Sequence, residues 1–258
     1  MAKRSWFAAF LIFILCGCVA HTSPARLVDG GTCELQGITT ILQEVGDDHA
    51  AGAKLLKRWD IPNDEVWESD STPRSGPYDQ YYHEAVRRAV ETDPAKILLV
   101  NDTFNNRVVA GHLHDWIKPA SCLEKTLIGQ QHSRMNMFSE PSEFASFVLL
   151  SRDEKTIRVY YYTINRNGIG KASPLIAPVR QDVQSGWQPL FVLHNHPIVP
   201  GDPQLNGAPS PSVPDADFQS GSAKYLGLPE ARITNGFHTV HMPAGSFKEF
   251  RLEGVEAP

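Results

Sequence analysis

The clearest hydrophobic pattern lies in the second half of the chain, where two apolar runs flank a short polar turn. Residues 144–150 (FASFVLL) are almost wholly apolar, and residues 156–164 (TIRVYYYTI) are rich in β-branched and aromatic side chains. The turn between them, residues 152–155, is RDEK. β-Branched and aromatic residues suit a pleated, half-buried surface. We therefore predict a β-hairpin over residues 144–164.

A helix, a strand and a second helix are predicted after this hairpin. The first helix covers residues 174–185, with Pro174 in its first turn, where proline is tolerated. A buried strand is predicted over residues 189–196, and a long loop rich in proline and glycine follows it. The second helix is predicted over residues 213–225, because Ser212 is a suitable N-cap.

The remaining signals are weaker, and most lie in the first half of the chain. Apolar residues at near-helical spacing predict a helix over residues 33–59. The other predicted elements are a loop over residues 60–80, a helix over 81–90, short strands over 96–100 and 107–110, a helix over 121–135 capped by Ser121, and two closing strands over 231–242 and 246–252. Together these elements predict an α/β fold of the α+β type, with a mixed β-sheet and flanking helices.

The N-terminal residues are typical of an export signal. Lys3 and Arg4 precede an unbroken apolar run over residues 6–15, and no acidic residue occurs before Asp29. The run is shorter than the roughly 20 residues that span a bilayer. Its length is that of the apolar region of a signal peptide.

The next residues, Leu15-Cys16-Gly17-Cys18, resemble a bacterial lipobox, in which a cysteine after a small residue becomes lipid-modified. Cys18 fits because Gly17 precedes it, whereas Cys16 follows the bulky Leu15. We therefore expect an exported protein of the bacterial envelope, lipid-anchored to the membrane through Cys18 and facing the periplasm. The alternative is a plain secretory signal that is cut near Ala20.

Two cysteines remain after this signal, Cys33 and Cys122. In an oxidising compartment such a pair can form a disulfide. The bond would close a loop of about 90 residues and stabilise the protein by about 4 kcal/mol in the chain-entropy model. Two free buried thiols are the alternative.

Length and charge complete the outline of the chain. Its 258 residues suffice for one large domain or two small ones. We predict a signal peptide at residues 1–18, a tether at 19–32, a helical or mixed N-terminal region at 33–125 and the mixed domain at 126–258. The formal net charge of -5 argues against nucleic acid as a partner, because nucleic-acid binding needs a basic face.

The residues that suggest chemistry lie at the end of the strand predicted over 189–196. His194 and His196 are two residues apart, and alternate residues of a strand point to the same side. Imidazoles are good zinc ligands, but a catalytic site needs a third protein ligand and an open position. Asp215 lies one turn into the helix that follows Ser212. A His-His-Asp set of this kind predicts a hydrolytic zinc site.

These residues also carry a resemblance to a known family. The sequence HNHP at residues 194–197, followed by PSVPD at residues 211–215, resembles the signature of JAMM (MPN-type) zinc metalloproteases, His-x-His-Pro and then Ser-x-x-Asp. The residues of the two motifs are most similar to those of the RadC-like branch of that family. The resemblance covers roughly residues 126–250 and implies a JAMM-like mixed sheet flanked by helices.

The resemblance also implies a role for each matching residue. His194, His196 and Asp215 would bind Zn²⁺. Glu143, which opens the first strand of the predicted hairpin, would be the general acid/base that moves a proton from the attacking water to the leaving amine. Ser212 would donate a hydrogen bond to the oxyanion, and one such donor is typically worth about 3 kcal/mol. The implied activity is zinc-dependent hydrolysis of amide or isopeptide bonds in a peptide or protein substrate.

Three alternatives stay open at this point. The loop over residues 198–211 is longer than is usual in the family, which predicts either an insertion at the rim of the site or a mismatch at Ser212 and Asp215. Glu140 is the rival to Glu143 as acid/base. The alternative function is a non-catalytic JAMM-like envelope lipoprotein that acts as a binding or structural module. The sequence fixes neither the substrate nor the oligomeric state.

Overall fold

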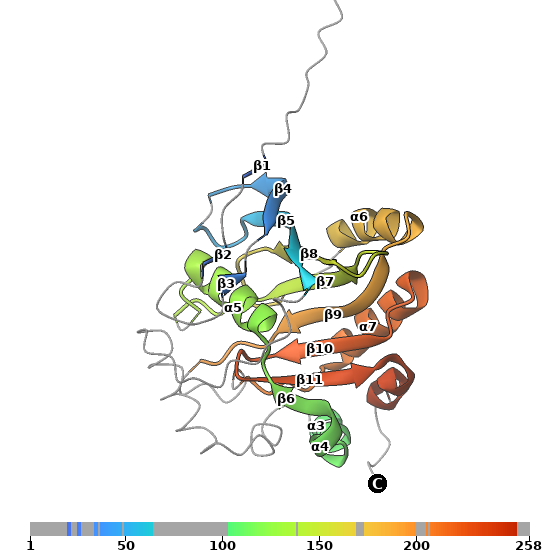
Figure 1. Cartoon of the computed structure of the whole chain (residues 1–258). Helices are drawn as coiled ribbons and strands as arrows, with labels where there is room; N and C mark the ends of the chain where they lie inside the picture. Colours follow the sequence, from blue (N-terminus) through green and yellow to red (C-terminus); the bar gives the residue numbers. More distant parts are fainter. Residues whose placement is uncertain are drawn as a thin grey trace, which may run out of the picture.

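The computed structural model of the chain describes residues 20–21, 25–26, 34–35, 37–47, 49–63, 103–137, 139–168, 173–199, 205 and 207–251 (Figure 1). The predicted lipid anchor Cys18, Cys33 and the elements predicted over 81–90 and 96–100 lie outside these residues. Within the described residues, no helix has the length and apolar character needed to cross a bilayer.

A mixed β-sheet forms the centre of the molecule (Figure 1). Its strands are β1 (Ala20–His21), β4 (Ile38–Val45), β5 (Lys54–Pro62), β6 (Ile117–Pro119), β7 (Phe144–Leu150), β8 (Thr156–Thr163), β9 (Gln188–Asn195), β10 (Glu230–Thr234) and β11 (His238–Pro243). Their order is β1-β4-β5-β8-β7-β9-β10-β11-β6. Neighbouring strands are antiparallel except β9 and β10, which are parallel. The short strands β2 (Ala25–Arg26) and β3 (Glu34–Leu35) form a separate pair.

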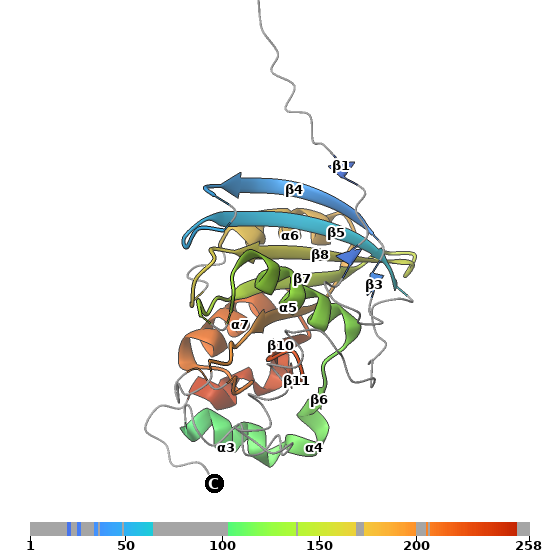
Figure 2. The ribbon, with the colours of Figure 1, turned by 90° about the vertical axis from the view of Figure 1, so that its left-hand side faces the viewer.

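Helices pack on both faces of this sheet, so the fold has three layers. One face is covered by α5 (Cys122–Arg134). The other face packs against α3 (Thr103–Gly111), α4 (Leu113–Trp116), α6 (Ser173–Gln184), α7 (Val213–Leu226) and the 3-10 helix η2 (Ala244–Arg251). Figure 2 shows β4 and β5 at one end of the sheet and α3 and α4 at the other end, beside β6. The predicted mixed sheet with flanking helices is therefore confirmed.

The alternation of side chains along β7 explains why there are two cores. Phe144 and Val148 point into the core under α5, whereas Ala145 and Phe147 point into the core under α6 and α7. All four side chains are fully buried. A strand that is apolar on both faces needs a layer on each side, and FASFVLL is such a strand.

Most elements predicted after residue 120 are present. The predicted hairpin is β7 and β8, and the predicted helix–strand–helix unit is α6, β9 and α7. Ser121 and Ser212 cap α5 and α7, and each accepts a hydrogen bond from the backbone N–H three residues later. Both caps were readable because serine is a preferred N-cap residue.

The helix predicted over residues 33–59 is wrong, because β4 and β5 occupy this part of the described chain. The spacing of Ile38, Ile41 and Val45 resembles a helix face. These three side chains are instead exposed on a strand next to the sheet edge, so they form no core stripe. The better signal is the alternation over 55–61, where every second side chain is buried against α5 or the sheet.

The strand predicted over residues 107–110 is also wrong, because these residues belong to α3. Two adjacent valines suggested a strand, since β-branched residues favour strands. In the structure Val109 is fully buried in the core shared with η2. The Asn105 amide fixes the same helix to the rest of the fold by donating to the carbonyl of Pro211 at 2.6 Å. Tertiary packing has overridden local propensity here.

The strand predicted over residues 231–242 is a hairpin of two strands, β10 and β11. The turn holds Asn235, Gly236 and Phe237, and Gly236 has a positive φ of 89°. The Asn235 side-chain oxygen accepts the backbone N–H groups of Phe237 and His238, at 3.0 and 2.9 Å. Asn-Gly is a strong hairpin signal, so the turn was present in the sequence.

The strand predicted over residues 246–252 is wrong as well, because the described part of this segment lies in η2. Phe247 and Phe250 are three residues apart and both are buried, which is the spacing of one face of a 3-10 helix. An alternation of period two does not fit this pair.

The sheet also crosses the predicted domain boundary at residue 126. β5 pairs with β8 along its full length, and residue 126 lies inside α5. Cys122, at the start of α5, is disulfide-bonded. The strand β3 begins one residue after Cys33 in the sequence, and it contacts α5. The pairing of Cys122 with Cys33 stays a prediction, because Cys33 is not among the described residues.

Candidate metal centre

Three elements, β7, β9 and α7, bring the candidate residues together at the carboxyl end of β9. β7 is antiparallel to β9, and Ala145 pairs with His194, so the start of β7 lies beside the end of β9. α7 connects β9 to the parallel strand β10 and therefore runs back along the sheet. Its first turn, which holds Asp215, consequently lies near the end of β9. The carboxyl ends of parallel strands are a common place for binding sites in such units.

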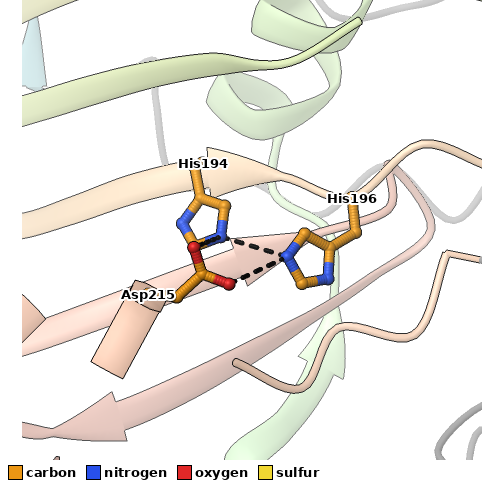
Figure 3. A group of neighbouring side chains, drawn as sticks. All are labelled: His194, His196 and Asp215. Atoms are coloured by element: carbon orange, nitrogen blue, oxygen red, sulfur yellow. Dashed lines mark hydrogen bonds and ion pairs between the residues drawn. The ribbon is translucent and has the colours of Figure 1, made fainter. Parts of the chain in front are cut away.

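The side chains of His194, His196 and Asp215 converge at this edge (Figure 3). The two Nε2 atoms are 3.2 Å apart. One Asp215 oxygen lies 3.5 Å from His194 Nε2, and the other lies 3.4 Å from His196 Nε2. His194 is buried, and the other two side chains are partly exposed. The site therefore opens toward solvent on the side of His196 and Asp215.

The orientation of His196 is fixed from the long loop that follows it. His196 Nδ1 lies 2.5 Å from the carbonyl oxygen of Ala208, so Nδ1 must carry the hydrogen and donate it. In the neutral form of His196, Nε2 would then carry the lone pair, on the side of His194 and Asp215. A metal-binding histidine commonly donates its other ring N–H to a carbonyl in this way, which fixes the tautomer.

The residue before Ala208 is held in turn by the turn between β10 and β11. The Asn235 amide donates to the carbonyl of Gly207 at 3.0 Å, and Asn235 is buried. Gly207 has a positive φ of 70°, and a Cβ there would collide with the buried side chain of Ile198. The predicted insertion over 198–211 is thus anchored at its end and supports a candidate ligand.

Asp215 is held by the N-cap of its own helix. Its Oδ2 atom accepts hydrogen bonds from the backbone N–H and the hydroxyl of Ser212, at 2.9 and 2.6 Å. The Ser212 hydroxyl oxygen accepts the backbone N–H of Asp215 at 3.3 Å. A hydroxyl has only one hydrogen, and in this arrangement Ser212 gives it to Asp215. The predicted role of Ser212 as oxyanion donor would require that hydrogen to turn away, and it stays a prediction.

The charges of the three side chains are strongly coupled. Burial lowers the pKa of His196, but hydrogen bonding to Asp215 and its negative charge outweigh burial and raise the pKa to about 9. Burial raises the pKa of Asp215, but the charges and hydrogen bonds of His194 and His196 outweigh it and hold the pKa well below its usual range. Without a metal, the proton on His196 therefore compensates the carboxylate. A divalent cation would take over this compensating charge.

Glu143 lies within electrostatic reach of this group. Burial raises the pKa of its carboxyl, the positive charges of His196 and His194 oppose that rise, and the charge of Asp215 adds to it. One carboxylate oxygen accepts the backbone N–H of Gly168 at 3.1 Å. By the alternation of β7, Glu143 faces the same side of the sheet as Ala145, which pairs with His194.

Glu140, the rival acid/base, is in a different environment. It is exposed in the loop between α5 and β7, where its backbone N–H bonds to the carbonyl of Asn136 at 2.7 Å. The carboxyl of Glu143 interacts electrostatically with all three candidate ligands, and its role as the acid/base stays a prediction.

The donor set fits a metal ion. Two neutral imidazole nitrogens and one carboxylate are donors that zinc and similar divalent ions accept. Within the described residues, His194, His196 and Asp215 are the one group of at least three such side chains close enough to share an ion. With an ion bound, the group could hold a water molecule or a substrate carbonyl within electrostatic reach of Glu143.

Sequence reasoning missed the residues that hold the candidate ligands in place. The Ala208 carbonyl accepts a hydrogen bond from His196, whereas Asn195 binds the backbone on either side of Glu143 and Asn235 binds the backbone next to Ala208. The Asn-Gly turn at 235 was a usable signal. The Ala208 carbonyl had no signal in the sequence, because any residue has a carbonyl.

Comparison of the chain with protein-family models, with curated proteins and with solved structures found no match. The resemblance to JAMM metalloproteases therefore rests on the motif residues alone.

Proposed function

We propose that this protein is a zinc-dependent metallopeptidase of the JAMM type, which hydrolyses amide or isopeptide bonds in a peptide or protein substrate. The observation that carries the proposal is the close approach of donor atoms from His194, His196 and Asp215, one from each residue within 4.8 Å of the others. The two Nε2 atoms are 3.2 Å apart, one Asp215 oxygen lies 3.5 Å from His194 Nε2, and the other lies 3.4 Å from His196 Nε2. A tetrahedral zinc with bonds of about 2.0–2.1 Å has neighbouring ligands about 3.3 Å apart. Each of these separations is close to that value.

The order of the residues in the chain supports the JAMM reading over other zinc sites. An acidic residue at the start of one strand, a histidine pair at the end of the next strand in space and an aspartate one turn into the following helix match the family's pattern in sequence. Glu143, the histidines and Asp215 also share one edge of the sheet. Three protein ligands leave one position open, as catalytic zinc sites do.

When bound, zinc would supply a Lewis acid that lowers the pKa of a water ligand to about 7 and polarises the substrate carbonyl. Glu143 would do the proton transfers. Burial raises the pKa of Glu143 toward neutral pH. A carboxyl with such a pKa can accept a proton from the attacking water and then give it to the leaving amine. The N–H of Gly168 would hold one carboxylate oxygen and so limit its rotation.

Ser212 would have two roles in this proposal. In the structure its hydroxyl orients the Asp215 carboxylate. A rotation of the hydroxyl hydrogen toward the substrate would make it the oxyanion donor that the family pattern implies. Because Asp215 Oδ2 also accepts the Ser212 backbone N–H, the carboxylate would keep a partner during that rotation.

The proposal extends to location. If Cys18 carries a lipid, the protein would act in the bacterial envelope on the periplasmic side, and its substrates would be envelope proteins or peptides. Changing Cys18 to Ser should then release the protein from the membrane fraction. A Cys18→Ser protein that fractionates as the wild type does would contradict the anchor but leave the zinc site untouched.

The experiment that tests the function uses zinc and a library of quenched-fluorescence peptides, with and without a chelator. The wild type should bind one zinc and cleave members of the library until the chelator is added. Glu143→Gln should keep the zinc and lose cleavage, whereas a His194→Ala/His196→Ala double variant should lose both. Zinc binding with no cleavage by the wild type would favour the non-catalytic binding module instead. A wild type that binds no zinc at micromolar metal would refute the metallopeptidase and leave the binding or structural module.

A further inference from the structure

We propose that Asn195 is a positioning residue that fixes Glu143 against the metal ligands, an inference that rests on the proposed function. Asn195 lies between the two histidines in the chain, at the end of β9. Its side chain faces the opposite side of the strand from theirs, by the alternation of the strand. It therefore takes no part in binding the metal, and its contacts lead to β7.

The Asn195 amide holds the backbone on both sides of Glu143. Its Nδ2 donates to the carbonyl oxygen of Ser142 at 3.1 Å, and its Oδ1 accepts the backbone N–H of Phe144 at 2.8 Å. All three residues are fully buried. One side chain thus satisfies two buried backbone groups that would otherwise cost free energy.

This contact continues the sheet beyond its last paired residues. The regular pairing of β7 with β9 ends at Ala145 and His194. A primary amide offers one donor side and one acceptor, as a peptide group does. The Asn195 side chain therefore replaces the missing rung of the ladder, and it does so where the backbone passes through Glu143.

Two further hydrogen bonds hold Glu143 from the other neighbour in the sheet. Its backbone N–H donates to the carbonyl of Arg166 at 3.1 Å, and its carbonyl accepts the hydroxyl of Thr163 at 2.8 Å. These bonds come from the end of β8 and the turn after it. Without the Asn195 contact, Glu143 would be held on one side alone.

The chemistry of the side chain makes asparagine specific for this place. Aspartate lacks the donor for the Ser142 carbonyl and would add a negative charge close to Glu143. Leucine, of similar size, would leave both backbone groups without a partner. A shift of about 1 Å in a catalytic group can reduce a rate by a factor of about 100. We therefore expect the contact to matter for the rate rather than for metal binding.

Asn235 provides a matched control for Asn195. It is also a buried asparagine whose amide binds backbone groups. Its amide donates to the carbonyl of Gly207, and the carbonyl of the next residue, Ala208, binds His196. Loss of Asn195 should disturb the acid/base, and loss of Asn235 should disturb the metal ligand. The two variants remove similar contacts and should therefore lose similar stability.

The test uses the full chain with Asn195→Ala and Asn235→Ala, and it measures three quantities. They are the affinity for zinc, kcat and KM for a quenched-fluorescence peptide that the wild type cleaves, and the exchange rate of the Phe144 amide hydrogen in the metal-free protein. Asn195→Ala should keep the zinc affinity within about threefold and the KM unchanged. Its kcat should fall about 10- to 100-fold, the usual range for residues that support a site. Its Phe144 amide should exchange faster. Asn235→Ala should weaken zinc binding about 10-fold or more and leave the Phe144 exchange unchanged.

Other outcomes would overturn the inference. If Asn195→Ala keeps the wild-type kcat, or loses zinc to the same degree as Asn235→Ala, Asn195 has no specific role at Glu143. If it fails to fold, Asn195→Ser, whose hydroxyl can satisfy one freed backbone group, takes its place with the same criteria. If the wild type holds zinc but cleaves no peptide, the proposed function fails and the positioning role fails with it. Cleavage by the wild type together with an unaffected variant overturns the positioning role alone.

Discussion

At the scale of single residues, the candidate metal ligands are held by backbone atoms and small polar groups. His196 depends on the Ala208 carbonyl, and Asp215 depends on Ser212. These supports fix the ring orientation of the histidine and the orientation of the carboxylate in the metal-free protein. Binding of a divalent ion would therefore need the loss of the proton on His196 but little movement of the side chains.

The pKa of His196 predicts a proton release on metal binding. In the metal-free protein His196 stays protonated up to pH about 9, whereas its ordinary pKa is 6.5. A metal needs the neutral imidazole, so zinc binding at pH 7.5 must expel this proton. Asp215 releases none, because its pKa is well below its usual range. The zinc affinity should therefore rise about tenfold per pH unit from pH 6.5 to 8.

Calorimetry of zinc binding in two buffers of different ionisation enthalpy measures this release. We expect about one proton per zinc at pH 7.5, in line with the linkage of metal binding to ligand deprotonation. A zinc affinity that does not change between pH 6.5 and 8 would show that His196 is already neutral or is not a ligand.

Gly207 gives a second prediction at this scale. Gly207→Ala should weaken zinc binding about tenfold or more, because residues behind metal ligands typically contribute that much. The added methyl group would strain a positive φ and collide with Ile198, which moves the Ala208 carbonyl away from His196. Gly221→Ala is the control, since a Cβ at that position in α7 meets no atom within 4 Å. Zinc titration should separate the two, and equal affinities would contradict the role of the loop.

At the scale of elements, the sequence predicts those parts of the fold that have one dominant signal. The strand β7 is predictable because its apolar run ends at a polar turn. The helices α5 and α7 are predictable because a serine N-cap marks where each begins. β4 and β5 were misread because exposed Ile41 and its neighbours have helical spacing by chance. The identity of an outer strand depends on its partner in the sheet, which a local pattern does not contain.

The same reasoning applies to the candidate site. His194, His196 and Asp215 were predictable because strand alternation and a helix cap place them by local rules. Their convergence also requires that α7 runs back along β9, which only the parallel pairing of β9 and β10 reveals. The support from Asn195 was not predicted, because it depends on which strand lies beside it.

The corrected strands lead to a prediction about stability. Trp59 on β5 is buried and lies 5.9 Å from Tyr161 of β8 between ring centroids. Trp59→Ala should lower the free energy of unfolding by about 3–5 kcal/mol, as large-to-small changes in a core do. Ile41→Ala on β4 should cost less than about 1 kcal/mol, because that side chain is 45% exposed. Urea unfolding measures both, and a small effect at Trp59 would contradict the packing of β5.

At the scale of the whole molecule, the N-terminal region and the motif-bearing half share one sheet. β5 covers the free edge of β8, and β6 covers the free edge of β11. The chain therefore contributes to the sheet from both sides of the predicted boundary at residue 126. The candidate metal site lies in the half that carries the JAMM-like motif, but its strands depend on neighbours from the other half.

A fragment of residues 126–258 should consequently not fold by itself. It lacks β5 and β6 and the N-cap of α5, so it would expose two sheet edges and part of a core. We expect the isolated fragment to aggregate or to unfold without a cooperative transition, as measured by circular dichroism during heating. A soluble fragment that unfolds cooperatively and binds zinc would instead support an independent domain at the predicted boundary.

X-ray absorption spectroscopy of the zinc-loaded protein tests the His-His-Asp zinc site, because it reports the atoms bound to the metal. We expect four nitrogen or oxygen ligands at about 2.0–2.1 Å, two of them imidazoles, and no sulfur. The His194→Ala/His196→Ala variant should retain no zinc after removal of free metal and hence give no imidazole signal. A zinc bound by sulfur at about 2.3 Å, or an unchanged spectrum in that variant, would contradict this site.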